Sequence, residues 1–138
     1  MRYSGQVDNL VQPRDGDVGF DLRADETIQI LPGEQRFIST GVILEIPHGY
    51  FGFVRDRSSI AALQLYVQAG VIDPSYRGEV QVVLSSHALV PYLIEKGDRI
   101  AQLILVPAFV PPLKYVSPVD GLTETKRGQK GFGSTGRR

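Results

Sequence analysis

Cysteine is absent from this chain of 138 residues, and histidine occurs only twice, as His48 and His87. The absence of cysteine excludes disulfides, thiolate nucleophiles and every zinc site with cysteine ligands. Two histidines are too few for a histidine-rich metal site, and His48 is expected in a surface turn because it stands between Pro47 and Gly49. Positive and negative side chains balance at 15 each, which argues against a general nucleic-acid binder or a basic membrane-surface protein.

Long apolar runs are also missing. No run approaches the length that spans a membrane, and the N-terminal stretch MRYSGQVDNL has no apolar signal core. We therefore expect a soluble protein of the cytoplasm, which would be that of the host cell if the source is viral. A length of 138 residues is typical of one domain, and no repeat or linker divides the chain.

Short apolar–polar alternations separated by turns dominate what is present. They predict strands over residues 18–24, 27–31, 37–46 with a break at Gly41, 50–54, 92–94 and 100–106. Many short strands of this kind indicate an all-β barrel or sandwich. One short helix is expected over 60–65, with Asp56, Ser58 or Ser59 as its N-terminal cap. The prolines between residues 107 and 118 predict an extended segment that is unsuited to a central strand.

The stretch 69–84 is the strongest candidate for a functional site. Turn-forming residues at 73–78 separate an apolar run from an alternation in which Val80, Val82 and Leu84 are expected to be buried. This pattern predicts a β-hairpin with the Asp73 carboxylate at its start and Tyr76 beside it. The stretch alone leaves open whether Asp73 does chemistry or only caps the turn.

Two further features are suited to binding anions. Arg57, Ser58 and Ser59 meet exposed N–H groups at the predicted helix start, although plain capping with a solvated arginine is the alternative. Gln102 interrupts an apolar strand and requires a hydrogen-bond partner if buried, in the protein or on a ligand.

The C-terminal residues 127–138 hold four glycines, two hydroxyl side chains and several cations. Such a segment is either a phosphate-cradling arm or a disordered basic tail. Phe132 favours the arm, because a lone aromatic side chain among glycines has no core to fill and is able to stack on a planar ligand.

Five motifs along the chain together resemble those of the trimeric dUTP pyrophosphatase (dUTPase) family. They are Val18–Leu22, Arg57–Ala61, Gly70–Asp73 with Tyr76–Gly78, Gly97–Leu103, and Arg127–Gly128 with Gly131–Gly136. Each motif alone is a weak signal, whereas five in the family's order at compatible spacing are specific. The resemblance covers nearly the whole chain.

The resemblance implies one domain over residues 1–138. It has an antiparallel jelly-roll-like barrel with one short helix in 1–125 and an extended glycine-rich C-terminal arm in 126–138 that closes the active site. It also implies a homotrimer with three shared active sites that hydrolyses dUTP to dUMP and pyrophosphate. Mg²⁺ would be held mainly by the substrate phosphates. No nucleic-acid or membrane partner is expected.

The resemblance further implies roles for individual side chains. Asp73 would be the general base that activates water for in-line attack on the α-phosphorus. Uracil and deoxyribose would contact Gly70, Val71, Ile72, Tyr76, Gln81 and Phe132. Phosphate oxygens would contact Arg57, Ser58, Ser59, Gln102, Arg127, Gly133, Ser134 and Thr135. Asp21 would act on the metal ion through water.

The related dCTP deaminases are the main alternative, because they share the fold and have similar second and third motifs. Such an enzyme needs a glutamate on the strand after the central loop, where this chain has Val83, and valine cannot transfer protons. A non-catalytic nucleotide-binding protein on the same scaffold is a third interpretation, against which Asp73 and the arm both argue.

Three positions depart from common forms of the family. Residues 63–66 lack a glycine that is often found after the second motif, and Gln81 stands where glycine is frequent. Gln68 precedes the central loop at a position where the family varies.

Overall fold

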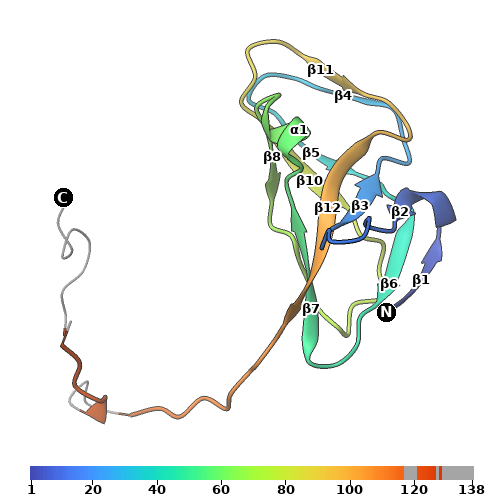
Figure 1. Cartoon of the computed structure of the whole chain (residues 1–138). Coiled ribbons are helices and arrows are strands. Elements are labelled where there is room, and N and C mark those ends of the chain that lie inside the picture. The colour runs from blue at the N-terminus through green and yellow to red at the C-terminus, as the bar shows by residue number, and fades with distance from the viewer. Residues whose placement is uncertain (117–120, 127, 129–138) are drawn as a thin grey trace.

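The computed structural model describes residues 1–116, 121–126 and 128, and it shows a nearly all-β chain (Figure 1). The strands are β1 (Arg2–Gly5), β2 (Leu10–Val11), β3 (Phe20–Arg23), β4 (Ile28–Ile30), β5 (Gln35–Ile38), β6 (Val42–Glu45), β7 (Tyr50–Arg55), β8 (Leu65–Gln68), β9 (Val71–Ile72), β10 (Val82–Ser86), β11 (Tyr92–Ile94) and β12 (Arg99–Pro107). The helical segments are the 3₁₀ turn η1 (Val7–Asn9) and the α-helix α1 (Ser58–Ala61). The expected all-β class with one short α-helix is confirmed.

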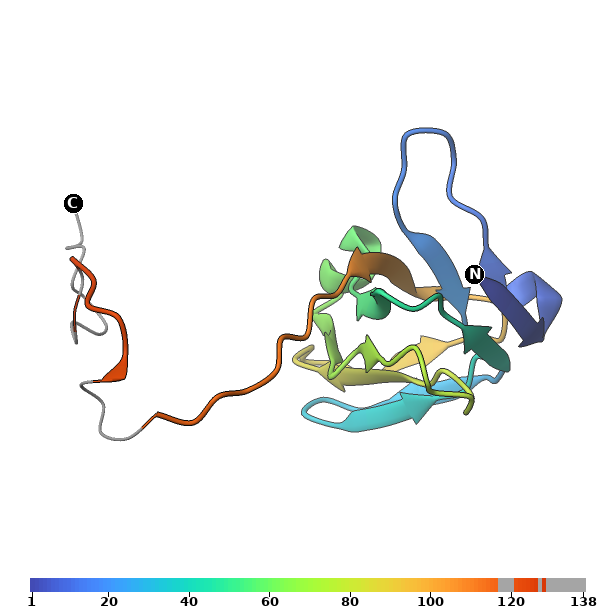
Figure 2. The same cartoon turned by 90° about the horizontal axis from the view of Figure 1, so that it is seen from below.

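The strands form four sheets whose pairings are antiparallel throughout the described residues. The largest has the order β2-β3-β12-β7-β9, and a second has the order β5-β10-β8. Two smaller sheets pair β1 with β6 and β4 with β11. This jelly-roll-like arrangement agrees with the fold expected from the sequence. After β12 the chain leads away from the body of the molecule (Figure 2).

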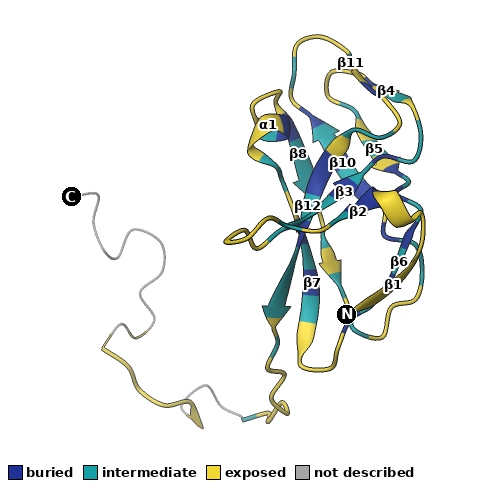
Figure 3. Cartoon of the chain, turned by 45° about the vertical axis from the view of Figure 1, so that its right-hand side comes forward, coloured by how far each residue is buried: buried dark blue, intermediate teal, exposed yellow. Residues whose placement is uncertain are grey.

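The core lies between the sheets and follows the period of two along each strand. Val80, Val82 and Leu84 are buried, as the alternation over 79–84 predicts. Figure 3 shows the buried residues along the inner strands and the exposed ones in the loops. Each such Val, Leu or Ile contributes about 1.5–3 kcal/mol through its burial. The strands that contribute these buried side chains therefore fix the positions of the loops between them.

The predicted hairpin over 69–84 is wrong in its pairing. β9 pairs with β7, where Gly52 faces Ile72, whereas β10 pairs with β8 and β5. The cause is a sharp change of direction after β8, because Ala69 and Gly70 have φ angles of 59° and 101°. The chain thus crosses to the neighbouring sheet, and the Val54 N–H donates to the Gly70 carbonyl at 2.8 Å.

The predicted helix is also shorter and capped differently than expected. Helix α1 ends at Ala61, and Gln64 follows with φ 61°, which is incompatible with a helix that continues to residue 65. Its N-cap residue is Arg57, without a side-chain cap. The Asp56 carboxylate instead accepts a hydrogen bond from the Val67 N–H, so it fixes β8 and does not cap the helix.

The strand predictions over 18–24, 27–31, 50–54, 92–94 and 100–106 are confirmed by β3, β4, β7, β11 and β12. Gly41 separates β5 from β6 with φ 65°, and His48 lies exposed in a turn. Among the described helices, none has the length and apolar character needed to cross a bilayer.

Candidate active site

Two separate cavities hold nearly all of the predicted site residues that the structure describes. The arginine cavity, of about 560 Å³, is lined by Val11–Arg14, Gly16–Gly19, Asp21, Arg57, Ser58, Arg99 and Gln102. The Asp73 cavity, of about 250 Å³, is lined by Phe37, Val54, Val67–Asp73, Tyr76, Glu79, Gln81 and Val83. The two linings have no residue in common.

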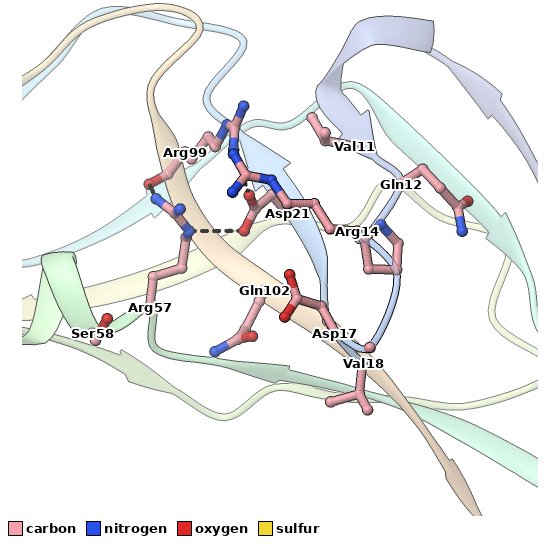
Figure 4. Close-up of a pocket in the computed structure, with 13 residues that line it drawn as sticks. Val11, Gln12, Arg14, Asp17, Val18, Asp21, Arg57, Ser58, Arg99 and Gln102 are labelled. Carbon is pink, nitrogen blue, oxygen red and sulfur yellow. Dashed lines mark hydrogen bonds and ion pairs between the residues drawn. The ribbon is translucent and has the colours of Figure 1, made fainter.

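The Asp21 carboxylate is at the centre of the arginine cavity (Figure 4). It accepts a hydrogen bond from Arg57 Nε at 2.7 Å and another from Arg99 Nη1 at 3.0 Å. Asp21 lies on β3 beside β12, so strand pairing brings these groups together from distant parts of the sequence. Arg57 Nη1 also donates to the Arg99 carbonyl at 3.3 Å. The two guanidinium groups are thus held at the cavity, where their planar forks suit phosphate oxygens.

Gln102 also lines the arginine cavity, and its side-chain amide has a hydrogen-bond partner, as expected for a polar residue within an apolar strand. Its Nε2 donates to the Asp56 carbonyl at 2.7 Å, which satisfies the amide within the protein. A Cβ atom at Gly19 would lie 2.3 Å from Gln102 Oε1, so a larger residue at this position would displace the amide. Ser59 is the exception among the predicted phosphate ligands, because it does not line this cavity. Its Oγ accepts a hydrogen bond from Arg57 Nη1 at 3.4 Å.

The Asp73 cavity lies where β7 and β9 meet the sheet of β5, β10 and β8. It brings together every described residue that was expected to contact uracil or deoxyribose, namely Gly70, Val71, Ile72, Tyr76 and Gln81, together with Asp73. Among the described residues, the Asp73 carboxylate has no hydrogen bond or ion pair. The alternative in which this side chain only caps the turn therefore has no support in the geometry.

Internal hydrogen bonds hold the loop that carries Asp73. The Tyr76 N–H donates to the Asp73 carbonyl at 3.1 Å, and the Tyr76 hydroxyl donates to the Glu79 carbonyl at 2.9 Å. Arg77 Nη1 donates to the carbonyls of Pro74 and Tyr76, both at 2.7 Å. At the start of the loop, a Cβ atom on Gly70 would lie 2.5 Å from the Val54 carbonyl oxygen, and its φ of 101° also favours glycine.

Glu79 anchors the other end of this loop, a role that sequence reasoning missed. Its Oε1 accepts hydrogen bonds from the Ser39 hydroxyl, from the Gly41 N–H at 2.8 Å and from the Thr40 N–H at 3.0 Å. The hydrogen bond from Ser39, followed by that from Gly41, holds the pKa of Glu79 below its ordinary value. The sequence around Glu79 shows only a polar residue in an alternating pattern. It does not indicate that this carboxylate binds donors about 40 residues earlier in the chain.

We expect Glu79→Gln to destabilise the fold by about 1–3 kcal/mol at pH 7, because an amide is a poorer acceptor for three clustered donors. The folded-state pKa is lowered, so the carboxylate stabilises the protein above the unfolded value near 4.5. This contribution is lost as the pH falls through the folded-state pKa. Urea denaturation of wild type and variant from pH 7 to pH 3 measures the difference, which should shrink toward the acid end.

Glu95→Gln is the matched control, since Glu95 is exposed and its side chain has no hydrogen bond among the described residues. Its stability should follow that of the wild type throughout. A Glu79→Gln difference that is independent of pH would contradict the proposed anchoring by the ionised carboxylate.

Sequence reasoning also missed several residues of the two cavities. Arg99 belongs to the fourth motif, and its place beside Asp21 would have required the β3–β12 register. Arg14 and Asp17 lie in a loop with no periodic pattern. The predicted arm residues Arg127, Phe132, Gly133, Ser134 and Thr135 lie outside the described residues.

The fold and the two cavities define a class: a jelly-roll-like β protein with a cationic cavity suited to phosphates and a separate cavity with one free carboxylate. Comparison with known proteins narrows this class. The family model for dUTPase matches residues 7–136. A deoxyuridine 5′-triphosphate nucleotidohydrolase of Anaeromyxobacter sp. is 47% identical over 126 residues, which cover 89% of this chain and 84% of that protein.

Another nucleotidohydrolase of this name, from Chlamydia trachomatis serovar L2, is 42% identical over 126 residues, covering 88% of this chain and 86% of that protein. Among solved structures, the dUTPase of Staphylococcus bacteriophage 80alpha with dUPNHPP has a TM-score of 0.88 and 29% identity, with 98% of this chain and 97% of that chain covered. The chain belongs to the dUTPase family.

Proposed function

We propose that this chain, a dUTPase that hydrolyses dUTP to dUMP and pyrophosphate, uses Asp73 as its general base. The observation that supports this role is that the two cavities have chemically different linings. One cavity gathers guanidinium, hydroxyl and amide groups that suit a triphosphate, and the other places a free carboxylate beside apolar walls that suit a base and sugar. The proposed location is the cytoplasm, where nucleotide pools are found.

In the proposed mechanism the Asp73 carboxylate takes a proton from a water molecule, and the water oxygen bonds to the α-phosphorus. The bond from this phosphorus to the bridging oxygen breaks, and that oxygen leaves with the pyrophosphate. Arg57, with Ser58 and Gln102, would bind the phosphate oxygens on which charge develops. The arm residues Arg127, Gly133, Ser134 and Thr135 would add phosphate contacts, and Phe132 would stack on uracil.

The described residues fit a magnesium ion that is held mainly by the substrate. They contain no group of three or more His, Asp or Glu side chains arranged to hold a metal. Asp21 and Asp17 are the carboxylates of the arginine cavity, and Mg²⁺ commonly keeps waters while it binds phosphates and one or two carboxylates. Such an ion would supply positive charge that neutralises the charge developing on the leaving pyrophosphate. Asp21 would then support it through water.

We further propose that each active site is assembled from several chains of a homotrimer. In this proposal a single nucleotide would join the Asp73 cavity of one chain to the arginine cavity of another, two cavities that have no lining residue in common. Residues 108–116 also need a partner. Phe109, Val110, Leu113 and Tyr115 are each at least 87% exposed on a segment that leaves its own body (Figure 2). Their burial against neighbouring chains would stabilise the trimer.

A panel of nucleoside triphosphates tests the activity. We expect pyrophosphate release from dUTP and no ammonia release from dCTP, with light scattering giving the mass of three chains. Binding of dUTP without turnover would refute the catalytic proposal.

Tyr76 is proposed to exclude ribose. We expect Tyr76→Ala to raise the kcat/KM ratio of UTP to dUTP by about tenfold or more, because the ring that would crowd a 2′-hydroxyl is removed. Its side chain lines the Asp73 cavity and is 44% exposed, so the ring is accessible to a ligand. Tyr76→Phe is the matched control, since it keeps the ring and loses only the hydrogen bond to Glu79. An unchanged ratio in Tyr76→Ala would assign the exclusion of ribose to another residue.

A further inference from the structure

Phe37 on β5 is a feature of the Asp73 cavity that the motifs and the proposed chemistry leave unused. Its side chain is 62% exposed, whereas the adjacent Ile38 is fully buried. Single exposed apolar side chains are ordinary on protein surfaces. This one is distinguished by its position, because it lines the same cavity as Asp73 and Tyr76.

The strand register fixes where this ring stands. Val83 on β10 pairs with Phe37 on one side and with Gln68 of β8 on the other. Directly opposed residues of neighbouring strands project from the same face of a sheet, so the three side chains form a row, and all three line the cavity. The opposite face of these strands is buried in the core, which makes the row a rigid support.

Aromatic side chains are distributed unequally between the two cavities. The Asp73 cavity has Phe37 and Tyr76 in its lining, whereas the arginine cavity has none. The two rings also come from different places, since Phe37 belongs to the sheet of β5, β10 and β8 and Tyr76 to the loop after β9. A flat ligand between them would have an apolar wall from the sheet and backbone polar groups from the loop.

We propose that Phe37 is an aromatic wall for the pyrimidine ring in the Asp73 cavity and thereby sets affinity for the base. This inference rests on the proposed function of the same cavity. A pyrimidine has apolar faces and a polar edge. The ring of Phe37 contacts a face, while the backbone of residues 70–72 is available to the edge. Phe37 belongs to strand β5 of the body, whereas Phe132 lies outside the described residues.

Kinetics and binding of Phe37→Ala test the proposal. We expect the KM for dUTP and the Kd for dUMP to rise about tenfold, as is typical when an aromatic side chain that stacks on a base is removed. The kcat should change by less than about twofold, because a wall that binds ground state and transition state alike affects KM. Inhibition by inorganic triphosphate, which has no base, should be unchanged. Phe37→Tyr should restore wild-type values.

Tyr50→Ala is the control, since Tyr50 is an exposed aromatic residue of β7 that lines neither cavity. The proposal is overturned if Phe37→Ala leaves KM and Kd unchanged. It is also overturned if this variant loses the trimer mass and thermal stability, because the ring would then belong to a contact between chains. A wild-type chain that binds dUMP through Phe37 without hydrolysing dUTP would refute the proposed function and leave this inference standing.

Discussion

Asp73→Asn is expected to bind dUTP with nearly wild-type affinity and to lose turnover by about 10²- to 10⁴-fold. Asparagine has nearly the same shape as aspartate, but its amide cannot take the proton of the attacking water. The Asp73 carboxylate has no partner among the described residues, so the substitution breaks no hydrogen bond or ion pair of the described fold. Pyrophosphate release gives kcat, and calorimetry with a non-hydrolysable dUTP analogue gives the affinity.

Asp8→Asn is the matched control, because Asp8 is an exposed carboxylate in η1 that lines neither cavity. Its kcat should equal that of the wild type. Near-normal turnover of a folded, trimeric Asp73→Asn protein would remove Asp73 from the role of general base. A loss of affinity equal to the loss of turnover would instead assign Asp73 to substrate binding.

Two inactive variants are expected to regain activity when they are unfolded together in equal amounts and refolded. One is Asp73→Asn, and the other is Arg57→Ala, which keeps Asp73 but lacks one guanidinium group of the arginine cavity. If a site takes its two cavities from different chains, about a quarter of the sites in randomly mixed trimers receive two intact cavities. If both come from the same chain, no site is intact.

Each variant refolded alone is the control and should stay nearly inactive. Native mass spectrometry shows whether mixed trimers have formed. Mixed trimers without recovered activity would refute the assembly of sites between chains, while the chemistry proposed for Asp73 would be unaffected.

Local patterns in the sequence predicted the parts of this fold that depend on near neighbours. The alternation over 79–84 identified Val80, Val82 and Leu84 as core residues, and Gly41 marked a break between strands. Asp73 with its neighbours, and Arg57 with Ser58, line cavities, whereas Ser59 does not line the arginine cavity. These successes follow from side-chain periodicity and turn chemistry, which act over a few residues.

Long-range pairing accounts for most of what the sequence could not predict. No local pattern indicates that β9 pairs with β7. Nor does any local pattern indicate that Val83 pairs with Phe37 on one side and with Gln68 on the other. The same holds for the three donors that converge on Glu79. The division of the candidate site between two cavities is also a property of the folded chain, because motifs in sequence order do not reveal which surfaces they share.

Among the described residues, Gln64 and Ala69 are the non-glycine residues with positive φ, and their positions have a consequence for strand addition at a sheet edge. They stand immediately before and after β8, which is an edge strand of only four residues. An edge strand presents unpaired N–H and C=O groups on which foreign strands add, and short edges limit this growth. Because the backbone leaves the extended conformation at both ends, β8 cannot lengthen in either direction. The positive φ angles thus keep this edge short, which limits the length of backbone on which a foreign strand could add.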